Sequence, residues 1–104
     1  MKNKVKVQSK LPIQEATSKI PSGKFWTMRI EPGAPTVLGE RILPGIMVVK
    51  NHGPGTIVVD TGYNYENVKL LPGRVQVIGT YNKVEAMTID ENSALLEFEY
   101  MPKS

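Results

Sequence analysis

Apolar and polar residues alternate with a period of two along much of the chain, which is typical of β-strands. The pattern is clearest near the C-terminus, where Leu96, Phe98 and Tyr100 alternate with two glutamates. Because successive side chains of a strand point to opposite faces, we expect the three apolar residues to face a core and the glutamates to face solvent.

Residues 24–31 alternate in the same way and predict another strand, with Trp26, Met28 and Ile30 on its core face. Trp26 is the only tryptophan of the chain. Two interpretations of its ring stay open at this point. It is either an anchor of the core or a surface on which a ligand stacks.

Two copies of the tripeptide Leu-Pro-Gly, at residues 43–45 and 71–73, each precede a run rich in β-branched residues. Proline holds φ near −65° and glycine accepts a positive φ, a combination that suits tight turns. We therefore expect each copy to be a turn that starts a strand. A further turn is expected at residues 51–55, which contain two glycines and a proline.

The stretch from Arg74 to Ile89 alternates over almost its whole length and predicts two long strands. The polar residues near its middle, Asn82 and Lys83, interrupt the pattern. Asparagine tolerates the left-handed conformation that two-residue turns require. We therefore expect a tight hairpin here, with Asn82 at positive φ.

About eight or nine short strands, at intervals of roughly 8–12 residues, are expected in all. The 104 residues are enough for a single domain with one core. We predict an all-β fold: an antiparallel two-sheet sandwich of jelly-roll or Greek-key type, with a closed barrel as the alternative.

Charge is distributed unevenly along the chain. Residues 1–24 carry six lysines and one glutamate, a net charge of +5, whereas the remainder carries seven basic and nine acidic side chains, a net charge of −2. We expect residues 1–22 to form a basic N-terminal arm or edge strand with a proline-containing loop, and residues 23–104 to form the β-sandwich domain. The candidates in the arm for binding an acidic protein surface are Lys2, Lys4 and Lys6. A solvated terminus is the alternative.

Residues suited to catalysis are scarce. The chain has no cysteine and a single histidine, His52, which excludes disulfides, thiolate nucleophiles and multi-histidine metal sites. No Gly-x-Ser-x-Gly motif accompanies it. We therefore predict no enzyme activity, no catalytic residue, no metal site and no cofactor. The acidic balance beyond the arm argues against a nucleic-acid partner, and no apolar run approaches the roughly 20 residues of a membrane helix.

Aromatic side chains suggest a different function. Tyr63 and Tyr65 lie in a polar segment between expected strands, and Tyr81 follows a later strand. Tyrosine beside asparagine in a loop is a common composition of binding surfaces. Trp26, Tyr63 and Tyr65 are therefore candidate stacking platforms for a small ligand or a carbohydrate, and loop packing is the alternative.

The stretch from Ile46 to Tyr100 resembles small β-sandwich modules of tailed-phage virions and related accessory proteins. The residues that carry this resemblance are the strand–turn–strand at 48–60, the Leu-Leu-Pro-Gly segment at 70–78 and the closing strand at 94–100. The resemblance carries over no catalytic residue. It implies a role in assembly or binding, often as an oligomer.

We therefore expect a non-enzymatic structural or binding module that acts as a homo-oligomer or docks on a larger protein assembly. Binding of a small ligand or carbohydrate is the alternative function. The N-terminal lysines are not followed by an apolar segment, so no signal peptide is expected. Cytoplasmic synthesis, with assembly into a virion, is the localisation that the resemblance implies.

Overall fold

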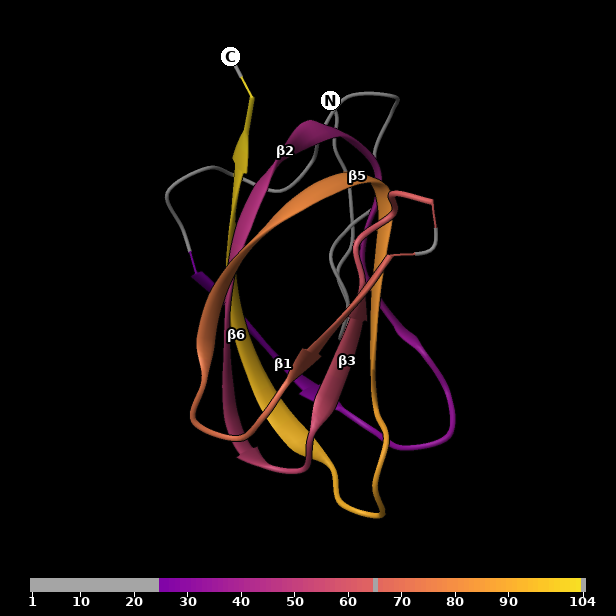
Figure 1. The fold of residues 1–104 in the computed structure, drawn as a ribbon, viewed down its shortest axis with the longest axis vertical. Coiled ribbons are helices and arrows are strands. Elements are labelled where there is room, and N and C mark those ends of the chain that lie inside the picture. Colours follow the sequence, from indigo (N-terminus) through magenta and orange to yellow (C-terminus); the bar gives the residue numbers. More distant parts are fainter. Residues whose placement is uncertain (1–24, 65, 104) are drawn as a thin grey trace.

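The computed structural model describes residues 25–64 and 66–103 (Figure 1). Within these residues there are six strands: β1 (Phe25–Ile30), β2 (Thr36–Pro54), β3 (Ile57–Asp60), β4 (Asn67–Leu70), β5 (Val75–Thr88) and β6 (Ala94–Pro102). They form one sheet in the order β1-β6-β2-β5-β3-β4, and every neighbouring pair is antiparallel. The prediction of an antiparallel all-β fold is confirmed. The described residues include no helix that could cross a membrane.

The single sheet folds over so that its two halves face each other, and the long strands β2 and β5 run through both (Figure 1). One half, here called the β6 half-sheet, contains β1, β6, residues 45–54 of β2 and residues 75–80 of β5. The other, the β3 half-sheet, contains the remaining parts of β2 and β5 together with β3 and β4. The arrangement is consistent with the expected sandwich. It is not the closed barrel, because β1 and β4, the two ends of the sheet, do not pair with each other.

The corner between the half-sheets lies where Ile42 of β2 pairs with Asn82 of β5. The register shifts on both sides of Ile42, Arg41 has φ of 56° and Asn82 has φ of 64°. The positive φ expected for Asn82 is therefore correct, but the expected hairpin is wrong. The strand bends at this point and continues as β5, because β2 bends with it and keeps the pairing.

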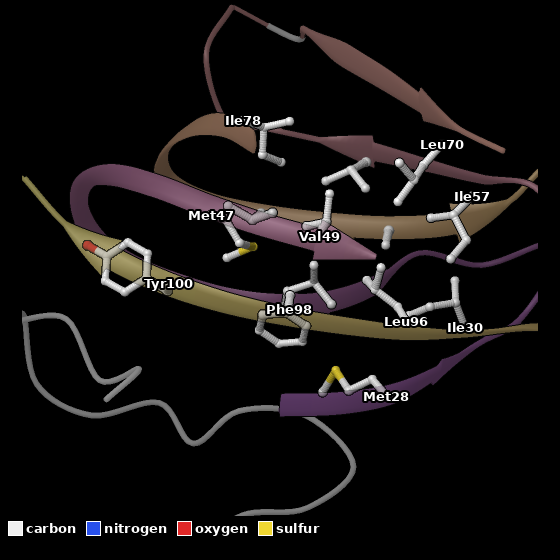
Figure 2. Packing of buried hydrophobic residues seen from close by; sticks show 14 of the residues in the cluster. Met28, Ile30, Met47, Val49, Ile57, Leu70, Ile78, Leu96, Phe98 and Tyr100 are labelled. Atoms are coloured by element: carbon white, nitrogen blue, oxygen red, sulfur yellow. The ribbon is translucent and has the colours of Figure 1, made fainter. Parts of the chain in front are cut away.

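The core lies between the inner faces of the two half-sheets (Figure 2). From the β6 half-sheet it receives Leu96, Phe98 and Tyr100, each fully buried, and from the β3 half-sheet it receives Ile57 and other aliphatic side chains. The expected inward face of the last strand is confirmed. Burial of each such side chain contributes about 1.5–3 kcal/mol, so this packing is the main source of stability.

Asn51 is a fully buried polar residue near the end of β2. Its side-chain nitrogen donates hydrogen bonds of 2.8 Å to the carbonyl oxygens of Gly55 and Leu70, and its side-chain oxygen accepts one of 2.6 Å from the N–H of Gly53. A buried amide is tolerated when its donors and acceptor are used in this way. Asn51 therefore ties the turn after β2 to β4.

Candidate functional site

Two tyrosine rings stack at the surface where the turn after β3 meets β5. The ring centroids of Tyr63 and Tyr81 are 5.5 Å apart, with 25° between the ring planes. Both side chains remain accessible, with 38% of Tyr63 and 45% of Tyr81 exposed. Stacked rings at this separation attract each other and hold each other in place. The pair is therefore a preformed aromatic surface.

Backbone contacts hold the turn against β5. The N–H of Tyr81 donates to the carbonyl oxygen of Thr61 at 3.0 Å, and the N–H of Glu66 donates to that of Tyr63 at 2.6 Å. Gly62, between Thr61 and Tyr63 in the sequence, has φ of 93°, and a Cβ there would collide with the carbonyl oxygen of Tyr81. Only glycine lets the two segments approach this closely.

An apolar hollow of about 490 Å³ lies on one side of this turn. Among the described residues, its lining includes Tyr63, Ile46, Gly79, Met101 and Pro102, and the one charged residue is Lys103. Strands β2, β5 and β6 thus meet the turn after β3 here. Because Gly79 has no side chain, the ring of Tyr63 can lie over β5, 3.8 Å from the position that a Cβ of Gly79 would take.

A polar hollow of about 400 Å³ lies on the other side of the same turn. Asp60 of β3 and Glu85 of β5 are directly opposite each other in the strand pairing and both line it. Lys83 also lines it, with its Nζ 3.5 Å from Oε2 of Glu85. The remaining lining is Gly62, Asn64 and Asn82. Among the described residues no three histidine, aspartate or glutamate side chains come close enough to hold a metal ion.

Hydrogen bonding already uses part of this polar lining. Oδ1 of Asp60 accepts a bond of 3.0 Å from the N–H of Gly62. The positive φ of Asn64 (44°) and of Asn82 (64°) belongs to the two bends that flank the tyrosine pair. The site therefore combines an aromatic surface, apolar walls and several carboxylate and amide groups within one turn and one bend of β5.

The structure places the candidate binding residues from the sequence in different locations. Tyr63 lies at the site, where its partner is Tyr81. Trp26 does not join them: it lies opposite the buried Phe98 in the pairing of β1 with β6 and packs against the core. Trp26 lines neither of the two hollows beside the tyrosine pair. The remaining candidates, Tyr65, Lys2, Lys4 and Lys6, lie outside the described residues, as does the arm of residues 1–22, which stays a prediction.

Sequence reasoning missed the pairing of Asp60 with Glu85 and the two hollows. The two carboxylates are 25 positions apart and meet only through the register of β3 on β5. No local motif marks either of them. The single histidine, His52, lies with its Nε2 2.7 Å from Oε1 of Glu97, on the outer face of the β6 half-sheet.

No model of a protein family matches the sequence, and no curated protein does either. Solved structures do have a similar fold. A putative ethanolamine utilization protein Q from Salmonella typhimurium LT2 aligns with a TM-score of 0.51 and 16% identity, over 77% of this chain and 58% of its own. The chain thus spans less than two thirds of that protein.

Two further structures align less closely. A cupin-2 domain containing protein from Shewanella frigidimarina has a TM-score of 0.47 and 15% identity, over 76% of this chain and 69% of its own. The TDP-quinovose 3,4-ketoisomerase from Campylobacter jejuni has a TM-score of 0.45 and 16% identity, over 83% and 70%.

These comparisons correct two predictions. The resemblance to phage virion modules is wrong, because the structure that aligns over 77% of this chain is a putative ethanolamine utilization protein and not a virion protein. The turns and alternating strands that suggested it occur in any antiparallel sandwich. The prediction of a non-enzymatic chain is also corrected: it rested partly on the resemblance to phage modules, and a likeness of fold alone does not exclude an activity. At 16% identity the likeness shows the fold alone: the described chain shares the β-fold of the Salmonella protein over 77% of its length.

Proposed function

We propose that this chain is a small-ligand-binding β domain, with its site at the Tyr63–Tyr81 pair and a carbohydrate as the ligand. The observation that supports it is the position of this stacked pair, beside an apolar hollow and a polar hollow that flank the same turn. Ligand sites combine apolar walls with a few placed polar groups. The surface at this turn has both.

Carbohydrate suits this combination of groups. The C–H face of a sugar ring packs on an aromatic ring, while its hydroxyl groups both donate and accept hydrogen bonds. Asp60 and Glu85 supply acceptors, and the amides of Asn64 and Asn82 supply both kinds of group. A sugar that lies across the tyrosine pair would use both hollows at once.

Among the described residues, side chains fill the space between the two half-sheets. Side chains that point inward from both half-sheets, such as Val49 and Phe98 from one and Ile57 from the other, have no exposed surface and pack against one another (Figure 2). A ligand there would have to displace core side chains at a cost of several kcal/mol. The outer surface around Tyr63 is therefore the better location.

Titration of the full chain with a panel of mono- and oligosaccharides, followed by NMR and by calorimetry, tests the proposal. We expect shifts in the signals of residues 60–64 and 79–83 for at least one glycan. Replacement of Tyr63 or Tyr81 by alanine should weaken that binding about tenfold or more, since a stacking contact and its buried area are lost.

The matched control is Phe25→Ala, which removes an exposed aromatic ring (54% exposed) from β1, outside both hollows. It should leave the affinity unchanged. The emission of Trp26 should also stay constant, because its ring packs against the core. Absence of binding across the panel, or equal losses in Phe25→Ala and Tyr63→Ala, would contradict the proposal.

A further inference from the structure

The first part of β5 forms an open edge of the β6 half-sheet. Residues 75–80 pair with β2 on one side. On their other side none of the described residues pairs with them. The first β5 residue with a described partner on that side is Tyr81, whose N–H donates to the carbonyl oxygen of Thr61. Within residues 25–64 and 66–103, the outward N–H and C=O groups of residues 75–80 therefore have no partner strand.

This edge differs from the other described edges in its side chains. Residues 75–80 contain no charged residue, and 57% of Val75 and 58% of Val77 are exposed. Elsewhere, β1 carries Arg29 at the opposite edge of the same half-sheet, and β4 carries Lys69. Natural sheets protect open edges with such charges, because an uncharged, apolar edge pairs readily with another strand.

The apolar surface continues from this edge onto β2. Val77 is directly opposite Val48, and Gly79 is directly opposite Ile46, which is 42% exposed. Residues opposite each other in an antiparallel pair point to the same face. The exposed face and the open backbone edge therefore adjoin each other, and a strand added along β5 would cover part of both.

We propose that a second copy of this chain covers the edge, with the two β5 strands antiparallel across a two-fold axis at Val77. In this register Val77 faces its own counterpart and Val75 faces Gly79, so only apolar or small residues meet on the outer face. The charged residues that bound the stretch, Arg74 and Lys83, stay clear of their counterparts. An isologous contact of this kind is self-complementary by symmetry.

Charge favours a second copy over the chain's own N-terminal segment. A strand built from residues 2–8 would bring three lysines to the edge. Residues 75–80 offer no carboxylate with which these lysines could pair, whereas two uncharged strands can pair without leaving lysines unpaired.

Because the two-fold axis is perpendicular to the sheet, both copies keep their outer faces on the same side. The inference does not rest on the proposed ligand, but Ile46 and Gly79 also line the apolar hollow beside Tyr63, so the second copy and a ligand would share that surface.

Light scattering coupled to size exclusion, together with sedimentation velocity, tests this with the full chain across a wide range of concentration. We expect a dimer, and we expect Val77→Lys to weaken self-association about a hundredfold or more, because two lysines would meet at the axis. Thr27→Lys is the matched control: it adds the same charge to an exposed position on β1, the opposite edge of the same half-sheet. It should dimerise like the parent.

Circular dichroism should show that Val77→Lys remains folded, since its side chain lies outside the core; Val75→Lys is the second variant if it does not. Hydrogen exchange gives an independent readout: amides in residues 75–80 should become more protected as concentration rises. A monomer at every concentration, or a dimer that survives both lysine substitutions, would overturn the proposal. Protection of these amides in a monomer would assign the edge to another segment of the same chain and would overturn it as well.

Discussion

The two Leu-Pro-Gly tripeptides are identical in sequence and different in structure. Residues 71–73 form a true reversal between β4 and β5: the N–H of Arg74 donates to the carbonyl oxygen of Leu71 at 3.0 Å, and Gly73 has φ of 85°. Residues 43–45 instead lie inside β2, which continues through them. The expected turn is thus confirmed for the second copy and wrong for the first.

The two glycines meet different requirements. Gly45 pairs with both β5 and β6, and a Cβ there would collide with the carbonyl oxygen of Met101 and approach the Cα of Pro102 and the ring of Tyr100. Around Gly73 a Cβ would meet nothing within 4 Å, but φ is positive. Glycine is therefore required at position 45 because β6 leaves no room for a side chain, and at position 73 because the backbone has a positive φ. A tripeptide that favours a turn becomes a strand when a strand on each side supplies partners.

The largest effect is expected from Gly45→Ala. The added methyl group has to push β2 away from the backbone of β6, and overpacking of this kind costs about 1–3 kcal/mol. For a chain of this size that corresponds to a fall in melting temperature of about 10 °C. Thermal and urea unfolding measure it. A smaller loss of stability than in Gly73→Ala would show that β2 and β6 can separate here. It would contradict the conclusion that Gly45 is required by its close neighbours.

An intermediate effect is expected from Tyr100→Phe. The hydroxyl of Tyr100 donates a hydrogen bond of 2.6 Å to the carbonyl oxygen of Leu43, which joins β6 to the first Leu-Pro-Gly copy. Removing the donor should cost about 1–1.5 kcal/mol, since the ring stays in the core and only the hydrogen bond is lost. Urea unfolding with an unchanged m-value is the measurement. An unchanged midpoint would mean that the strand pairing alone holds residues 43–45 extended.

A smaller effect is expected from Gly73→Ala. Space is available, so the cost comes only from placing an alanine at positive φ, about 1 kcal/mol. Gly73→Asn is the matched control, because asparagine tolerates this conformation and should cost less than alanine. The same unfolding series compares the two. Equal and large losses in both variants would indicate a steric conflict in the turn, which the structure does not contain.

The candidate site around Tyr63 also depends on segments that are distant in the sequence. Its aromatic composition marked Tyr63 as a binding residue from sequence, and this stays a prediction until a ligand is tested. The ring on which it stacks, Tyr81, and the carboxylate that pairs with Asp60, Glu85, come from a segment about 20 residues away. Local pattern could not assemble them, because strand register over such distances depends on the whole sheet.

By itself, the sequence determined the properties that depend on nearest neighbours. Alternation with period two assigned the inward faces of β1 and β6, and the density of turns and β-branched residues predicted an antiparallel all-β fold. Such patterns are local, because burial of one face constrains every second residue.

Only the tertiary structure decided how far each strand runs. The bends at Ile42 and Asn82 carry β2 and β5 through both half-sheets, where the sequence predicted turns and a hairpin. A residue at positive φ is compatible with a chain reversal and with a bend in a continuing strand. Which of the two forms depends on whether a neighbouring strand continues the pairing. The same pairing creates the hollows beside Tyr63 and leaves one side of residues 75–80 of β5 without a partner among the described strands.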